Sequence, residues 1–173
     1  MRYFLPVVLL TSLPVLHGCS PTLNWRDVRT DQTPLTALFP CKPDQVVRTV
    51  SLGAKDVAMT MLGCDAGDAT FTVTYADMKD GVNPGAALGQ WKAATLGNMR
   101  VGSASELPFP IKGASVSPQP VRVEVHGVRP DGTAVAMHAV WFASGTQVFQ
   151  AAVHADSVSP AVAESFFAGL RLQ

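Results

Sequence analysis

A short apolar stretch at the N-terminus constrains the rest of the chain more than any other feature. Arg2 precedes thirteen largely apolar residues, Phe4–Leu16. A bilayer-spanning helix needs about 20 apolar residues, whereas the hydrophobic region of a secretory signal peptide has about 7 to 15. Pro6 and Pro14 also disfavour a stable spanning helix. The stretch therefore predicts an export signal, and the rest of the chain is expected to fold outside the cytoplasm.

The sequence Leu16-His17-Gly18-Cys19 ends this stretch and resembles a bacterial lipobox. The resemblance implies a signal peptide over residues 1–18, diacylglycerol on the thiol of Cys19 and a lipid-anchored protein facing the periplasm. Ordinary signal-peptide cleavage without a lipid is the alternative. Ser20 follows the cysteine. In the resembled lipoproteins an aspartate at that position retains the protein at the inner membrane, so the serine favours the outer membrane.

The composition fits one folded domain. Removing the first 18 of 173 residues leaves 155, with 47% apolar and 15% charged residues in the whole chain. Lys plus Arg and Asp plus Glu number 13 each, so no charge excess is available to neutralise the phosphates of a nucleic acid. No nucleotide-binding or other cofactor motif occurs, so we expect no cofactor. Residues 19–38 are polar and proline-containing, which predicts a tether and lead-in before a domain over residues 39–173.

Two cysteines remain after Cys19 is assigned to the lipid. Cys41 precedes a valine-rich run over 45–52, and Cys64 follows a second run over 56–62, with a turn between the runs. A hairpin of these runs brings both thiols to the same end. Because an exported chain folds in an oxidising compartment, we expect a Cys41–Cys64 disulfide. A redox or metal-binding thiol pair is the alternative, but the Cys-x-x-Cys spacing is missing.

Alternation and capping signals predict the other elements. Phe71, Val73 and Tyr75 alternate with threonines, which is typical of a half-buried strand. Asn83-Pro84 and Ser159-Pro160 each combine an N-cap residue with proline at the first helical position. The expected strands cover 45–52, 56–62, 69–77, a short piece near 107–111, a run from 121, 133–143 and 147–155, and the expected helices are 84–99 and one from 160. Strand clusters each followed by a helix indicate an α+β domain, an antiparallel sheet packed by helices.

Three segments carry a family resemblance: Phe39-Pro40-Cys41-Lys42-Pro43, Val73-Thr74-Tyr75 and Ser165-Phe166-Phe167-Ala168-Gly169-Leu170. Together they resemble the PsbP/Mog1-like fold over residues 39–172, and the chain also resembles uncharacterised exported proteins of Gram-negative bacteria. The resemblance implies an α/β/α sandwich. It further implies an accessory or binding subunit rather than an enzyme, because the known relatives mainly stabilise or bind larger partners.

The histidines are the one constellation with catalytic potential. His126, His138 and His154 fall on three consecutive predicted strands, and Glu124 shares a strand face with His126. Neighbouring strands could gather these side chains into a metal site. Whether they converge depends on strand register, so histidines that are solvent-facing or singly hydrogen-bonded are the main expectation, and no metal site is assigned.

Other chemical signals are weak. The segment 113–117 lacks the second glycine of a Gly-x-Ser-x-Gly nucleophile elbow, so no catalytic residue is assigned. Asp65 with Asp68 flank a turn, Asp77 with Asp80 flank a helix entry, and both pairs are interpreted as local hydrogen-bonding residues.

Aromatic residues leave one binding hypothesis. Trp91, Trp141 and the pair Phe166-Phe167 either fill the core or line a cavity that contacts a ligand or a partner. The function expected is a binding or accessory component of an envelope assembly. A small-ligand carrier and a metal-assisted hydrolase are the alternatives.

Overall fold

A computed structural model describes residues 22–52, 55–79 and 82–173. The predicted signal peptide 1–18 and Cys19 lie outside these residues, as do Asp80 and the first two residues of the turn predicted after Leu52. Within the described part the chain forms ten strands and two helices, which is the mixed α+β class that the sequence predicts. No helix among the described residues is long and apolar enough to cross a membrane.

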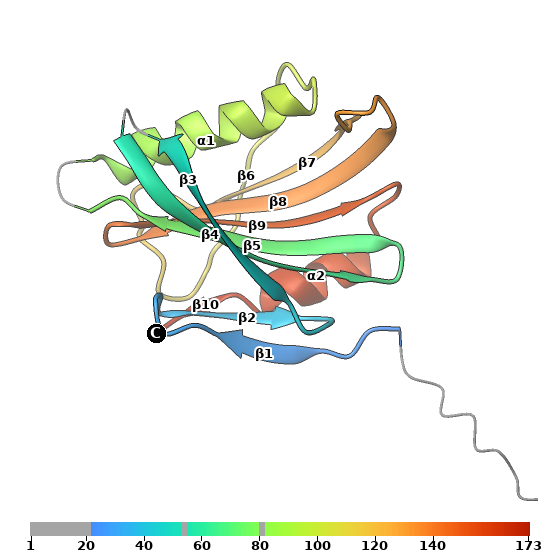
Figure 1. Ribbon diagram of the computed structural model, residues 1–173, viewed down its shortest axis with the longest axis horizontal. Helices are drawn as coiled ribbons and strands as arrows, with labels where there is room; N and C mark the ends of the chain where they lie inside the picture. The colour runs from blue at the N-terminus through green and yellow to red at the C-terminus, as the bar shows by residue number, and fades with distance from the viewer. Residues whose placement is uncertain (1–21, 53–54, 80–81) are drawn as a thin grey trace, which may run out of the picture.

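A large antiparallel sheet is the centre of the fold (Figure 1). Its strand order is β3-β4-β5-β9-β8-β7-β6. The bounds are β3 (Asp44–Leu52), β4 (Lys55–Ala66), β5 (Ala69–Asp77), β6 (Leu107–Pro108), β7 (Val121–Val128), β8 (Ala134–Ser144) and β9 (Gln147–Ala155). Every predicted strand is present, and β4 is longer than predicted because it continues through Cys64 to a turn of only two residues.

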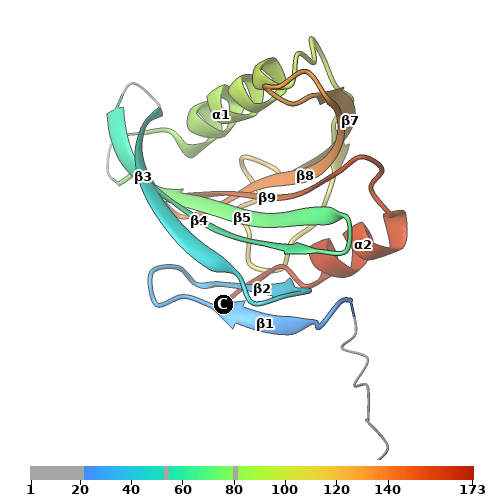
Figure 2. The same ribbon diagram turned by 45° about the vertical axis from the view of Figure 1, so that its right-hand side comes forward.

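One helix lies on each face of the large sheet. Helix α1 (Pro84–Asn98) starts as predicted, because the Asn83 side chain accepts hydrogen bonds from the backbone N–H groups of Gly85 (2.8 Å) and Ala86 (3.2 Å). It packs over one face through Trp91 and its neighbours. Helix α2 (Pro160–Ala168) covers the other face, where its two phenylalanines are fully buried (Figures 1 and 2).

The segment before residue 39 differs from the predicted tether. It contains β1 (Arg26–Arg29) and β2 (Leu35–Phe39), which form a small sheet with β10 (Arg171–Leu172) in the order β1-β2-β10. Leu35 is 4% exposed and packs beneath α2 with the rest of β2. The strands are only four and five residues long and are separated by polar residues, so their pairing depends on packing against α2 rather than on a local pattern. The folded domain therefore starts before residue 39.

The predicted disulfide is present. Cys41 lies just before β3 and Cys64 lies near the end of β4, with their Cα atoms 6.1 Å apart. The antiparallel pairing of β3 with β4 places Asp44 opposite Gly63, which brings both cysteines to the same end of the hairpin. Trp25, before β1, also packs on the domain, with its ring edge-on to Phe71 at a centroid distance of 6.2 Å.

Candidate functional site

The three histidines do not converge. His138 pairs with Val153 across β8 and β9, whereas His154 pairs with Met137. Residues directly opposite in a sheet share a face. Val153 belongs to the core under α2 and Met137 to the core under α1. His138 and His154 therefore point to opposite faces, and the part of the chain that is described contains no group of three or more His, Cys, Asp or Glu arranged to hold a metal.

His138 instead belongs to a polar cluster around Arg122 on the α2 side. Arg122 is only 8% exposed. It makes ion pairs with Glu124 (2.8 Å) and with Glu164 of α2, and its guanidinium carbon lies 5.1 Å from the ring centre of Phe167. The cluster links β7 to α2, so its charges are engaged in holding the helix on the sheet.

The environment of His138 keeps its imidazole neutral. Burial is the largest cause that lowers the pKa of His138, and the positive charge of Arg122 lowers this pKa further. Glu124, at 3.7 Å from Nδ1, acts in the opposite direction but does not offset burial. The Nδ1 atom lies 3.5 Å from an Arg122 nitrogen, a weak contact in which the neutral ring accepts.

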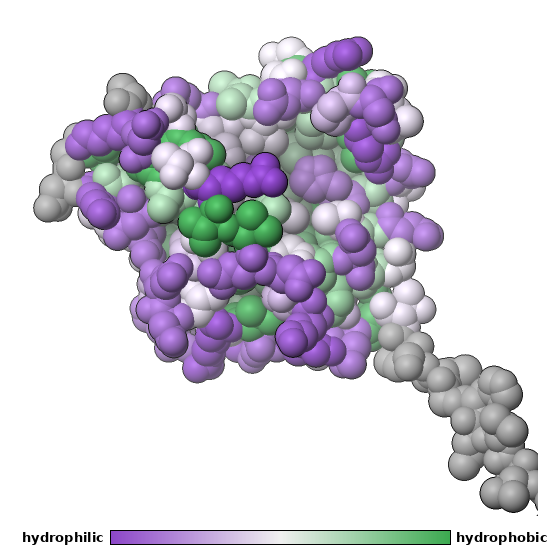
Figure 3. All heavy atoms as spheres, in the orientation of Figure 1, coloured by the Kyte–Doolittle hydropathy of each residue, from purple (hydrophilic) through white to green (hydrophobic). Residues whose placement is uncertain are grey.

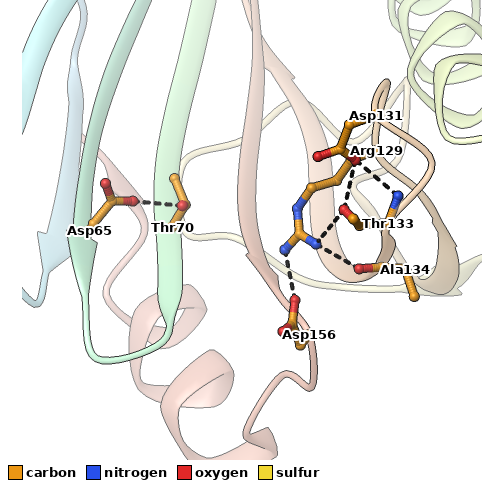
Figure 4. Close-up of polar contacts among 7 residues, drawn as sticks. All are labelled: Asp65, Thr70, Arg129, Asp131, Thr133, Ala134 and Asp156. Atoms are coloured by element: carbon orange, nitrogen blue, oxygen red, sulfur yellow. Dashed lines mark hydrogen bonds and ion pairs between the residues drawn. The ribbon is translucent and has the colours of Figure 1, made fainter.

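A second polar network fixes the strand ends (Figure 4). Arg129 donates to the carbonyl oxygen of Ala134 (2.6 Å) and to Asp156 (3.0 Å), which ties the β7–β8 turn to the segment after β9. Burial lowers the pKa of His154, and the charge of Arg129 lowers it further.

The predicted turn carboxylates act locally. Asp65 accepts a hydrogen bond from the Thr70 hydroxyl across its own hairpin (2.6 Å; Figure 4). Asp77 accepts from the Lys79 backbone N–H (2.9 Å) and from the Thr146 hydroxyl (2.8 Å). The contacts with Thr70 and Lys79 are local hydrogen bonds as interpreted, whereas the contact with Thr146 joins Asp77 to a turn that is distant in the sequence.

An uncovered trough runs along β3, β4 and β5 on the α1 side of the large sheet. The hairpin of β3 and β4 bends toward α1 (Figure 2), and residues of both strands line the trough. Two adjacent hollows, of about 430 and 280 Å³, have Val46 and Met61 in common, and the two together are called the trough below. The trough is lined by Lys42, Asp44, Asp65, Thr70 and Thr72 near the disulfide, and by Arg48, Val50, Met59, Thr74, Trp91 and Gln150 near α1.

The two ends of the trough differ in chemistry. The disulfide end is polar, with both a lysine and carboxylates. At the α1 end, methionine, valine and tryptophan side chains surround Gln150, which is 9% exposed and donates to the Thr95 hydroxyl at 3.5 Å. Val46 and Met61 are each 41% exposed between the ends. A hydrophobic patch flanked by hydrophilic side chains is visible in this region of the surface (Figure 3).

The two predicted contact tryptophans have different positions. Trp91 projects from α1 into the trough wall and is 9% exposed. Trp141 lies in the core beneath α1 and is 1% exposed, so it offers no contact surface to a partner. Phe166 and Phe167 are likewise core residues.

Sequence reasoning missed most of the trough. The sequence predicts Val46 and Met61 only as members of strands, because a regular strand pattern implies that one face is covered. One signal was present: Val46 and Val47 are adjacent, which breaks the alternation between apolar and polar residues in a strand that turns out to be largely exposed.

No protein-family model matches this chain, and no curated protein matches it significantly. Its function therefore has to be inferred from the geometry of the site.

Proposed function

We propose that the chain is an envelope lipoprotein that acts by binding. In this proposal residues 1–18 are a cleaved signal peptide, Cys19 carries the lipid anchor, and the domain faces the periplasm from the outer membrane. The domain serves as an accessory component of an envelope assembly. Its contact surface is the trough along β3, β4 and β5.

The observation that carries the binding role is the exposed apolar strip in the trough. Val46 and Met61 are each 41% exposed beside the nearly buried Trp91. Large apolar side chains grouped in a hollow with a polar rim are typical of protein interaction sites. The mixed lysine and carboxylate end would fix the direction in which a partner segment lies.

The PsbP/Mog1-like likeness remains part of the proposal. Two of the segments that carry it meet in the core, where Phe39 and Phe166 make an edge-to-face contact at 5.5 Å. An antiparallel sheet with helices on both faces is consistent with that fold. The accessory role of the fold's known relatives supports binding over catalysis, and the separation of His138 from His154 removes the geometric basis of the hydrolase alternative.

A small-ligand carrier is the second candidate, favoured by the hollow near Trp91, where the polar residues Arg48, Thr74 and Gln150 lie among apolar ones. Small-molecule sites are usually clefts or cavities of about 300 to 1,000 Å³ that bury most of the ligand surface. The hollow near α1 has about 280 Å³ and adjoins the second hollow of the trough. An open trough suits the side chains of an extended partner segment better than an enclosed ligand.

Photo-crosslinking from inside the trough tests the proposal. A photoreactive amino acid replaces Met61 in the full chain, expressed in the envelope of its own host. The matched control carries the same amino acid at Val116, which is 91% exposed and lies outside the trough. We expect one discrete adduct with an envelope protein from position 61 and none of that mass from position 116.

A third variant tests whether the trough itself is required. Thr74→Arg, added to the position 61 probe, places a long side chain on the trough floor and is expected to abolish the adduct. Identical adducts from positions 61 and 116, or an adduct that Thr74→Arg leaves unchanged, would contradict the proposal. A lipid that co-purifies with the unmodified chain in native mass spectrometry would favour the carrier instead.

A further inference from the structure

Strand β3 forms a long open edge of the large sheet. Among the described strands it pairs only with β4, and its residues 44–49 are all exposed. Natural sheets usually protect such edges with charged side chains, proline, a bulge or a very short strand. The opposite edge has this protection, because β6 is two residues long and contains Pro108. The nine residues of β3 contain no proline.

The register shows which backbone groups of β3 face outward. Two residues separate Leu52 from Lys55, so these form the hydrogen-bonded pair that closes the hairpin. Alternation from this pair directs the N–H and C=O groups of Val46 and Arg48 toward β4, and those of Gln45 and Val47 away from it. The β4–β5 hairpin supports this assignment. Its closing pair is Ala66 and Ala69, so the backbone N–H and C=O groups of the even-numbered β4 residues face β5 and those of the odd-numbered residues face β3.

Two opposite charges stand on one face of this edge. Asp44 and Arg48 are four residues apart, and within the described part of the chain neither makes an ion pair or a hydrogen bond through its side chain. If a second β3 pairs antiparallel with Val46 opposite Val46, each Asp44 lies opposite an Arg48. A longer overlap centred on Arg48 would place two arginines together, which is unfavourable.

We propose that two copies of this chain associate by antiparallel pairing of their β3 edges, with Val46 of each copy at the twofold axis and Asp44 of each opposite Arg48 of the other. Gln45 and Val47 then exchange backbone hydrogen bonds across the axis. Side chains directly opposite share a face, so the two troughs lie on the same face of one continuous sheet. The inference concerns a second copy of this chain and does not depend on what occupies the trough.

The overlap covers only residues 44–48, so the association is weak and reversible. Sedimentation velocity of the full chain at concentrations up to about 1 mM measures it. We expect a monomer–dimer equilibrium in the wild-type chain. Asp44→Arg and Arg48→Asp, each alone, place like charges opposite each other twice and should lower the association constant about tenfold or more.

Combining the two charge reversals, in one chain or in a mixture, tests whether the strands pair in this register. The double variant Asp44→Arg/Arg48→Asp is expected to regain the wild-type association constant. An equimolar mixture of the two single variants should form mixed dimers, because one carries two positive residues and the other two negative residues at these positions. A wild-type chain that stays monomeric throughout, or a dimer that the single reversals leave unchanged, would overturn the proposal.

Val47→Pro tests the backbone pairing. It removes an N–H that faces away from β4, so the fold should persist while the dimer is lost. Val47→Ala, which keeps this N–H, is the matched control and should keep the dimer. Near-ultraviolet circular dichroism establishes that each variant is folded. A dimer that survives Val47→Pro in a folded chain would also overturn the proposal.

Discussion

At the scale of single residues, close backbone approaches fix how the layers sit on one another. A Cβ atom at Gly169, directly after α2, would lie 2.2 Å from the Cβ of Leu38 in β2. Glycine is therefore required for the contact between the end of α2 and the small sheet. Gly89 of α1 is exposed and has open space around its missing side chain.

These two glycines give a matched pair of stability predictions. Gly169→Ala forces β2 away from α2 and should lower the free energy of unfolding by about 1–3 kcal/mol. Gly89→Ala should raise it by about 0.5–1 kcal/mol, because alanine favours a helix over glycine. Urea denaturation of both variants measures the changes, and a neutral Gly169→Ala would contradict the packing described.

The partly buried histidines predict a loss of stability in mild acid. Burial lowers the pKa values of His138 and His154 below the ordinary value of 6.5, so the folded state binds their protons less readily than the unfolded state. The contribution of the two neutral histidines to the free energy of unfolding is complete above pH 6.5. It is lost as the pH falls through their folded-state pKa values. We expect the urea midpoint to fall between about pH 7.5 and pH 5, and to fall less in His154→Gln.

A carboxyl variant controls for other acid effects. The pKa of Asp77 is held below 3.8, chiefly by the hydrogen bond from the Lys79 backbone N–H. Asp77 therefore keeps its charge over the same interval, and Asp77→Asn should retain the full wild-type fall. If His154→Gln and Asp77→Asn show the same pH dependence, buried histidines are not its cause.

At the scale of elements, the sequence predicts correctly those strands and helices whose own residues carry a local signal. The alternation around Phe71 gave β5 at its observed bounds, and the Asn83-Pro84 pair gave the start of α1. Strands β1, β2 and β10 carry no comparable signal, because two or a few residues acquire strand geometry only by pairing across the chain. The trough escaped prediction for a related reason: the bend of β3 and β4, not their residue types, leaves Val46 and Met61 uncovered.

The disulfide is predicted to stabilise one hairpin and one end of the trough. It closes a separation of 23 residues between Cys41 and Cys64. Cys41→Ser/Cys64→Ser should lower the free energy of unfolding by about 3 kcal/mol, largely by enlarging the unfolded ensemble. Denaturation of the wild-type chain with and without reductant provides the parallel measurement. Equal stability of the oxidised and reduced chains would contradict a structural role for the bond.

At the scale of the whole molecule, the described part of the fold has two covered faces of the large sheet and an open region beside them. Helix α1 lies over one face of the large sheet, and α2 with the small sheet closes the other. The open region is the β3–β4 hairpin, which lies at one edge of the large sheet (Figure 1), together with its trough. A domain of this form, held at a membrane surface by its N-terminus, would present that region to other envelope components.

The intact mass of the protein recovered from the membranes of its host tests the proposed lipoprotein most directly. We predict the mass of Cys19–Gln173 plus acyl chains, with a gain of two hydrogens when the disulfide is reduced. One spectrum thus reports cleavage, acylation and the redox state of Cys41 and Cys64. An unlipidated chain, or one that still contains residues 1–18, would contradict the lipid-anchored envelope protein proposed here.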